Sequence, residues 1–184
     1  MKLYFATSNL NKLREAEHIL GMRLARKNIE IDEVQEVDGR KVVGKKAMSA
    51  YEAIKAPLIV EDTCFHINAL NGFPGALAKW MQAYLGHEMI CRLMDSYKDR
   101  SAYAITYVAF YDGKEMRMFS GRISGSISRK PGGRTGFGWD HIFIPKGHSR
   151  LFAEMSMEEK SRISMRMKAL SKLRKFLLRK GYIK

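Results

Sequence analysis

Two long strand-like segments joined by a tight turn constrain the fold of this chain most. Residues 103–111 and 115–127 have the composition of strands, and Asp112-Gly113 between them is a strong signal for a β-hairpin. A hairpin requires antiparallel pairing, whereas the other apolar runs alternate with helical patterns along the chain. The sequence therefore predicts one α/β domain over residues 1–184, with a mixed sheet.

The remaining elements are predicted from hydrophobic spacing and capping residues. Strands are expected at residues 2–6, 28–34, 58–62 and 142–144. Helices are expected directly after residues 7–9, over about 40–55, in two stretches separated near Gly86-His87, and after a capping box of Ser156 and Glu159. The last helical region has an apolar face of Ile163, Met167, Leu170, Leu173 and Leu177.

Composition limits the class of protein. With 184 residues and 46% hydrophobic residues, the chain is long and apolar enough for one domain with a sizeable core. Its apolar stretches are too short to span a bilayer, and its start lacks a secretion signal, so no membrane partner is expected. Cys64 and Cys91 are the only cysteines, which predicts free thiols in a cytoplasmic protein.

Positive charge gathers at the C-terminal end. The net charge is +14, and residues 146–184 hold 12 Lys and Arg against 3 Asp and Glu. Such a surface attracts polyanions, which include nucleic acids and free nucleotides. For most of these residues a solvated helix face is the preferred interpretation.

Glu61 and Asp62 follow the apolar run Leu58-Ile59-Val60, where a buried strand is predicted to emerge into a loop. A carboxylate in an apolar setting is costly unless a metal or a cation pairs with it. Because side chains alternate along a strand, only one of the two can face a given cleft. The pair therefore indicates one metal-binding or water-activating carboxylate with a supporting neighbour. The alternative is a solvated strand end with two surface acids.

Residues 7–12, Thr-Ser-Asn-Leu-Asn-Lys, join a predicted strand to a helix N-terminus. Free backbone N–H groups there favour an anion, and Lys12 adds a positive charge, so a phosphate would fit. The alternative is a capped helix with a surface lysine. Glu33 also lies near a predicted strand end, and Mg²⁺ takes one or two carboxylates together with substrate phosphates. Glu33 and Asp62 could supply those carboxylates, whereas the alternative for Glu33 is an exposed acid.

The segment 135–140 places aromatic residues among glycines. Phe137 or Trp139 could stack on a nucleobase, and Asp140 could accept a hydrogen bond from a base edge. Their alternative is a loop whose rings plug into the core. Lys160, Ser164 and Arg166 could contact phosphate and base, or be ordinary surface of a basic helix. The five histidines have no zinc spacing, and Cys64 is expected to be a buried apolar residue.

In this order the segments resemble the inosine triphosphate pyrophosphatase, or Ham1-like, family. The resemblance runs over nearly the whole chain and rests on Thr7, Asn9 and Lys12, on Glu33-Val34-Gln35, on Val60-Glu61-Asp62-Thr63, on Gly72-Phe73-Pro74-Gly75, on Phe137-Gly138-Trp139-Asp140, and on Ala153-Glu154-Met155, Glu159-Lys160 and Ser164-Met165-Arg166. It departs at Met165, where the family has histidine, at His141, where it has proline, and at Cys64, where glycine is frequent.

The resemblance implies an elongated, twisted sheet in two lobes around a central cleft, and hydrolysis of ITP, dITP and XTP to the monophosphate and pyrophosphate with Mg²⁺. Glu33 and Asp62 would hold the metal, and Asp62 would also be the base for water. The implied substrate-binding residues are Thr7, Ser8, Asn9, Lys12, Lys46, Thr63, Phe137, Gly138, Trp139, Asp140, Lys160, Ser164, Met165 and Arg166. A homodimer is also implied.

Two alternatives stay open. The first is a pyrophosphatase of the same fold that acts on other modified nucleotides, which the Met165 substitution leaves open. The second is a basic nucleic-acid-binding domain without catalysis that uses residues 146–184. It is disfavoured because it leaves the carboxylates and the aromatic box without a role.

Overall fold

The computed structural model describes residues 2–29 and 34–183. Three long antiparallel strands run through the molecule: β3 (Leu58–Ile67), β5 (Ser101–Tyr111) and β6 (Met116–Ile127). The predicted hairpin is confirmed, because β5 and β6 pair from Tyr111↔Met116 to Ser101↔Ser126. The prediction that a strand ends at Asp62 is wrong: β3 keeps pairing with β5 as far as Ile67↔Ala102, which satisfies its backbone groups beyond the two carboxylates.

Short strands complete a sheet of seven strands in the described part of the chain. β1 (Tyr4–Ala6) is parallel to both β2 (Ala25–Lys27) and β3, whereas β4 (Pro74–Gly75) and β7 (Phe143–Pro145) are antiparallel to their partners. The main order is β2-β1-β3-β5-β6-β7, with β4 on β3, so the mixed α/β sheet is confirmed. The strand predicted at 28–34 includes residues 30–33, which lie outside the described residues. Residues 28, 29 and 34 are not in a strand, and β2 ends just before them at Lys27.

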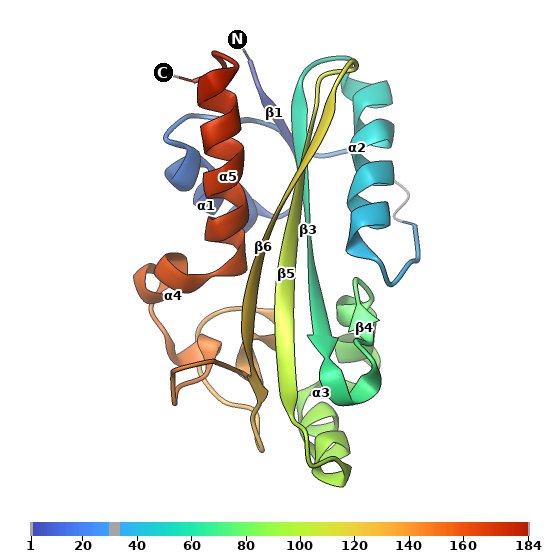
Figure 1. Cartoon of the computed structure of the whole chain (residues 1–184), viewed down its shortest axis with the longest axis vertical. Coiled ribbons are helices and arrows are strands. Elements are labelled where there is room, and N and C mark those ends of the chain that lie inside the picture. Colours follow the sequence, from blue (N-terminus) through green and yellow to red (C-terminus); the bar gives the residue numbers. More distant parts are fainter. Residues whose placement is uncertain (1, 30–33, 184) are drawn as a thin grey trace.

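Helices cover both faces of the sheet (Figure 1). α1 (Leu10–Leu20) and α5 (Met165–Arg179) lie on one face and α2 (Gly39–Ile54) on the other. α3 (Ala78–Leu93) lies at the end of the molecule opposite the two termini (Figure 1). It is kinked at Gly86, where φ is 70°, so the two predicted helical stretches form one interrupted helix. α4 (Met157–Ile163) begins with the predicted capping box of Ser156 and Glu159. Short 3₁₀ turns occupy Asn68–Leu70, Met94–Ser96, Gly138–His141 and Phe152–Glu154.

The core has three parts that correspond to these layers. α1 and α5 pack on the sheet around Phe5, Ile59 and Phe110. α2 packs on the opposite face around Val60, and the far end is filled by aromatic rings such as Phe143. In the predicted apolar face of the last helix Leu170, Leu173 and Leu177 are fully buried, whereas Met167 and Ile163 are half-buried. No helix in the described residues is both long and apolar enough to traverse a lipid bilayer.

Candidate functional site

A gap in the sheet creates the main cleft of the molecule. β1 pairs with β3 only at Leu58 and Ile59, and β4 pairs with the same edge only at Phe65 and His66. Between these points β3 borders a cavity of about 990 Å³. Every site residue predicted from the sequence within the described residues lines it: Thr7, Ser8, Asn9, Lys12, Lys46, Asp62, Thr63, Phe137, Gly138, Trp139, Asp140, Lys160, Ser164, Met165 and Arg166. Glu33 lies outside the described residues, although Val34 and Gln35 beside it line the cleft.

The N-terminus of α1 opens into this cleft. Asn9 caps the helix, because its Oδ1 accepts hydrogen bonds from the backbone N–H groups of Asn11 (2.9 Å) and Lys12 (3.2 Å). Thr7 Oγ1 accepts from the Asn9 N–H at 3.1 Å. The capped helix and the anion site are therefore compatible interpretations of one segment. The positive end of the helix dipole and Lys12 both favour a negatively charged ligand here.

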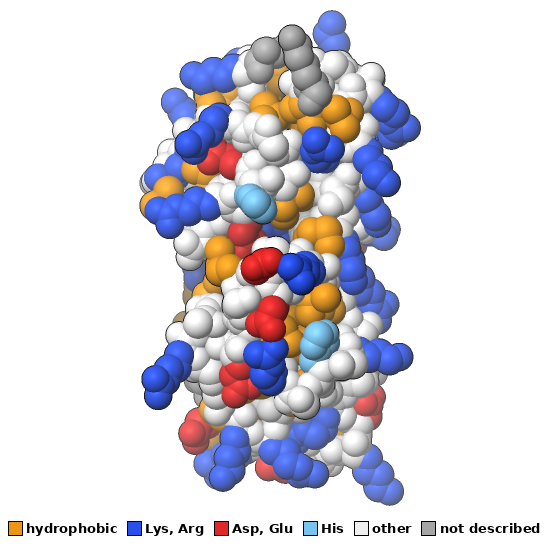
Figure 2. All heavy atoms as spheres, turned by 90° about the vertical axis from the view of Figure 1, so that its left-hand side faces the viewer, with side chains coloured by type: hydrophobic (Ala, Val, Ile, Leu, Met, Phe, Trp, Pro, Cys, Tyr) orange, Lys and Arg blue, Asp and Glu red, His pale blue; other side chains and the backbone are white. Residues whose placement is uncertain are grey.

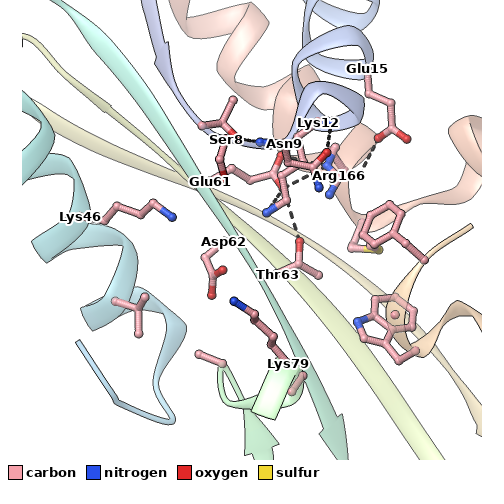
Figure 3. A pocket seen from close by; sticks show the side chains of 18 of the residues that line it. Ser8, Asn9, Lys12, Glu15, Lys46, Glu61, Asp62, Thr63, Lys79 and Arg166 are labelled. Carbon is pink, nitrogen blue, oxygen red and sulfur yellow. Dashed lines mark hydrogen bonds and ion pairs between the residues drawn. The ribbon is translucent and has the colours of Figure 1, made fainter. Parts of the chain in front are cut away.

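Glu61 and Asp62 alternate across β3 and have different surroundings. Glu61 is 2% exposed and faces the α1 and α5 side, whereas Asp62 is half-buried and lies on the α2 side. In Figure 3, Lys46 from α2 and Lys79 from α3 both extend toward Asp62. Asp62 is therefore the carboxylate of the pair that lies among lysines within the cleft.

Glu61 holds a buried charge network together. Both its oxygens accept from Arg166 Nε, at 3.0 and 2.9 Å, and Lys12 Nζ lies 3.4 Å away. Glu15 accepts from Arg166 Nη1 at 2.6 Å. Burial raises the pKa of Glu61, but the positive charges and hydrogen bonds of Arg166 and Lys12 outweigh burial and keep it below its ordinary value. The network ties α1, β3 and α5 together at the wall of the cleft.

The aromatic box forms the opposite wall. The Phe137 N–H donates to Asp140 Oδ2 at 3.0 Å, and Lys160 Nζ lies 2.5 Å from the same oxygen. The Phe137 ring is 44% exposed, and the guanidinium of Arg166 lies 6.0 Å from its centroid. The Trp139 ring stacks on Phe65 in the core, with centroids 4.9 Å apart. Each of the two interpretations therefore applies to one ring. Trp139 is packed in the core and holds the loop in place, whereas the exposed face of Phe137 is available to stack on a nucleobase.

Two of the departures from the family pattern, Met165 and His141, lie near this wall, whereas Cys64 packs on the α2 side of the sheet. Met165 is 6% exposed and packs into the core at the far end while it lines the cleft. Ser164 caps α5, with its Oγ accepting from the Met167 N–H at 3.1 Å. Cys64 is fully buried, as predicted, and burial raises the pKa of its thiol to about 12. His141 makes a hydrogen bond through Nδ1 to the Gly132 carbonyl at 3.0 Å.

Sequence reasoning missed Glu15, Glu36 and Lys79, which also line the cleft, and it gave Glu61 only as a possible supporting neighbour of Asp62. A signal existed for Glu15, because it lies three residues after Lys12 and so shares a helix face with it. Lys79 follows the Gly72–Gly75 loop at the start of α3. The role of Glu61 depends on Arg166, 105 residues away, which no local pattern indicates.

The carboxylates of the cleft suit a metal ion that is also coordinated by a bound phosphate compound. Within the described residues no three His, Cys, Asp or Glu side chains are grouped as a metal site. Mg²⁺ needs fewer protein ligands, because it binds through one or two carboxylates together with waters and substrate phosphates. Asp62 in the cleft, near the helix N-terminus that favours phosphate, fits this requirement.

Fold and site together define an α/β protein with a cleft for a ligand that is anionic at one end and aromatic at the other. Comparison with known proteins agrees: the sequence model of the Ham1 family matches residues 3–176. The chain belongs to the Ham1 family.

Relatives resemble the chain over nearly its whole length. It is 43% identical to an inosine triphosphate pyrophosphatase of Aspergillus fumigatus, over 96% of this chain and 95% of that protein. It is 39% identical to a dITP/XTP pyrophosphatase of Saccharolobus solfataricus, over 96% of this chain and 94% of the relative. Among solved structures, a HAM1 protein from Coxiella burnetii matches with a TM-score of 0.85 and 26% identity, covering 97% of this chain and 99% of that one.

Proposed function

We propose that this chain is a Mg²⁺-dependent nucleoside triphosphate pyrophosphatase that hydrolyses ITP, dITP and XTP to the nucleoside monophosphate and pyrophosphate. Removal of these deaminated purines from the nucleotide pool, in the cytoplasm, would be its role. The observation that carries the proposal is the convergence of a helix N-terminus, lysines, Asp62 and the exposed Phe137 ring in one cleft. The two free cysteines are in keeping with a reducing compartment.

The phosphate end of the cleft performs the hydrolysis in this proposal. Asp62 accepts a proton from the water that attacks the α-phosphorus, and pyrophosphate leaves as the bond to the β-phosphate breaks. Lys12, Lys46 and Lys79 lie where they can stabilise negative charge on the phosphates. Asp62, with Glu33, would hold Mg²⁺, which supplies charge neutralisation at the phosphates when bound.

The aromatic wall selects the base. Phe137 stacks on the purine, and Asp140 accepts a hydrogen bond from its N1–H group. Asp140 Oδ2 already accepts from Phe137 N–H and Lys160. Asp140 Oδ1 accepts no hydrogen bond from the described residues, which leaves that atom for the base. Arg166 donates to the 6-keto oxygen. Adenine presents the opposite pattern at both positions and would leave buried polar groups unpaired, so it is rejected strongly.

Release of pyrophosphate from separate nucleotides tests both halves of the proposal. With Mg²⁺, ITP and XTP are expected to yield pyrophosphate and monophosphate, whereas ATP yields little. Guanine shares the N1–H and 6-keto groups of hypoxanthine, so the two assigned contacts do not by themselves reject GTP. Equal turnover of all four nucleotides would contradict the assigned base contacts and point to a pocket altered by Met165. Turnover of none would contradict the enzymatic function itself. Omission of Mg²⁺ with excess chelator is expected to stop the reaction.

A homodimer completes the proposal, and the exposed apolar side chains of α3 support it. Trp80 and Tyr84 are stacked, with ring centroids 6.3 Å apart, and Tyr84 is 82% exposed. Such a patch marks a protein–protein contact more often than open surface. Sedimentation is expected to find a dimer for the wild type and a monomer for Tyr84→Glu. Tyr97→Glu, at an exposed tyrosine outside α3, is expected to stay dimeric.

A further inference from the structure

α5 carries a row of cations on the face turned away from the core. Lys168, Lys172, Lys175 and Arg179 are spaced by four, three and four residues, which places them on one side of the helix, and all four are exposed. We call these four residues the basic stripe. It extends for about 16 Å at the rise of an α-helix. α5 contains no Asp or Glu, so nothing on the helix offsets this charge.

The basic stripe follows the outer edge of β6. Lys168 Nζ donates to the Arg122 carbonyl at 3.0 Å, and Lys172 Nζ donates to the Ser120 carbonyl at 2.6 Å. β6 pairs with β7 only over residues 125–127, so these carbonyls belong to a part of the edge without a partner strand in the described residues. The two lysines therefore cover an open strand edge and hold their charges beside it.

A cavity of about 420 Å³ lies at the end of the basic stripe, between α5 and β6. It is lined by Arg117, Phe119, Phe176, Arg179 and Lys180. Phe119 is half-buried and packs on Phe176, with ring centroids 5.5 Å apart. Lys180 Nζ and Arg117 Nε share the carboxylate of Glu115, at 2.7 and 2.5 Å. The three cations that line the cavity therefore outnumber the single acid, Glu115, that pairs with two of them, and they lie beside the rings of Phe119 and Phe176.

This arrangement differs from an ordinary solvated helix face. Like charges four residues apart, as at Lys168 and Lys172, destabilise a helix, whereas solvated helices usually alternate charges of opposite sign. A polyanion would remove the repulsion and release counterions. A membrane surface fits less well, because the apolar face of α5 that would enter it is fully buried at Leu170, Leu173 and Leu177.

We propose that the basic stripe and the adjoining cavity bind single-stranded nucleic acid. Phosphates lie along the stripe, and a base enters the cavity against Phe119, which is the combination of charge and aromatic stacking that single strands need. Figure 2, which faces the side of the molecule with α1, α4 and α5, shows Lys and Arg side chains along both long margins and acidic side chains toward the middle. None of the stripe residues lines the nucleotide cleft, so the two sites are separate.

Fluorescence anisotropy of a labelled single-stranded oligonucleotide of mixed sequence tests the proposal with the full chain. In a plot of log K against log salt concentration, each phosphate contact to a single strand contributes about −0.7 to the slope, so each contact removed makes the slope shallower by about 0.7. The triple variant Lys172→Gln, Lys175→Gln, Arg179→Gln is therefore expected to lose about 2 in slope and about 100-fold in affinity at 0.1 M salt. Phe119→Leu is expected to weaken single-strand binding about tenfold with an unchanged slope.

A matched control removes the same charge elsewhere. Lys98→Gln, Lys130→Gln, Lys146→Gln changes three exposed lysines outside α5 and β6, and is expected to bind the oligonucleotide as the wild type does. Pyrophosphate release should be unchanged in both triple variants, which shows that they are folded and separates this proposal from the catalytic one. Equal weakening in both triples, tighter binding of the matching duplex, or binding to anionic vesicles but not to the oligonucleotide would overturn it.

Discussion

Asp62→Asn is expected to abolish pyrophosphate release while the protein stays folded. The substitution keeps the shape of the side chain but removes the proposed base and a negative charge from the cleft. Loss of a general base alone costs about 10²–10⁴ in rate, and weaker metal binding would add to that. Single-turnover assays with ITP at saturating Mg²⁺ measure the effect on the chemical step.

The matched control for this variant is Asp99→Asn, which makes the same change at an exposed aspartate outside the cleft. It is expected to leave turnover unchanged. If Asp62→Asn kept more than a tenth of the wild-type rate, the assignment of Asp62 as base would fail, and another group would have to accept the proton.

Glu61→Gln is expected to destabilise the fold by about 3 kcal/mol, because it leaves the buried Arg166 with only Glu15 as a charged partner. Urea unfolding followed by circular dichroism measures the free energy of unfolding. Glu52→Gln removes one partner of an exposed pair with Lys55 and is expected to have little effect. Equal stability of the two variants would contradict a structural role for the buried network.

The stability due to Glu61 should depend on pH in a defined direction. Its pKa in the folded protein is held below the ordinary value of 4.5. Its contribution is therefore fully present above pH 4.5 and is lost as the pH falls through the lower folded-state pKa. The difference in unfolding free energy between wild type and Glu61→Gln should be constant near neutral pH and shrink in acid. A difference that grows in acid would contradict this sign.

Local patterns were enough to predict the elements whose signals lie within a few residues. Asp112-Gly113 fixed the hairpin, and Ser156 with Glu159 fixed the start of α4, because turn and cap chemistry involve only near neighbours. The residues of the cleft were predicted through resemblance, and all those in the described residues line one cavity.

The errors arose where distant pairing decides the structure. The segment Ala25-Arg26-Lys27 contains no β-branched or aromatic residue, yet it forms β2 through parallel pairing with β1. The polar residues from Glu61 to Thr63 predict the end of a strand, but β5 continues to pair with β3 as far as Ile67. Composition describes a side chain's preference for water, whereas the partner strand decides where a backbone stays extended.

The continuous pairing of β3 with β5 has a consequence for how this cleft can change. Ten consecutive residues of β3 are matched to β5, with Glu61 opposite Val108 and Asp62 opposite Tyr107. A shift of one residue would turn every side chain of the strand to the opposite face. A shift by one residue that brought Asp62 to the position that anchors Arg166 would put Glu61 at the position of Val60 in the core and Thr63 at the position of Asp62. A single residue inserted or deleted ahead of this pair would therefore leave either the anchoring position or the proposed reacting position without an acid, so the strand can vary in sequence far more readily than in length.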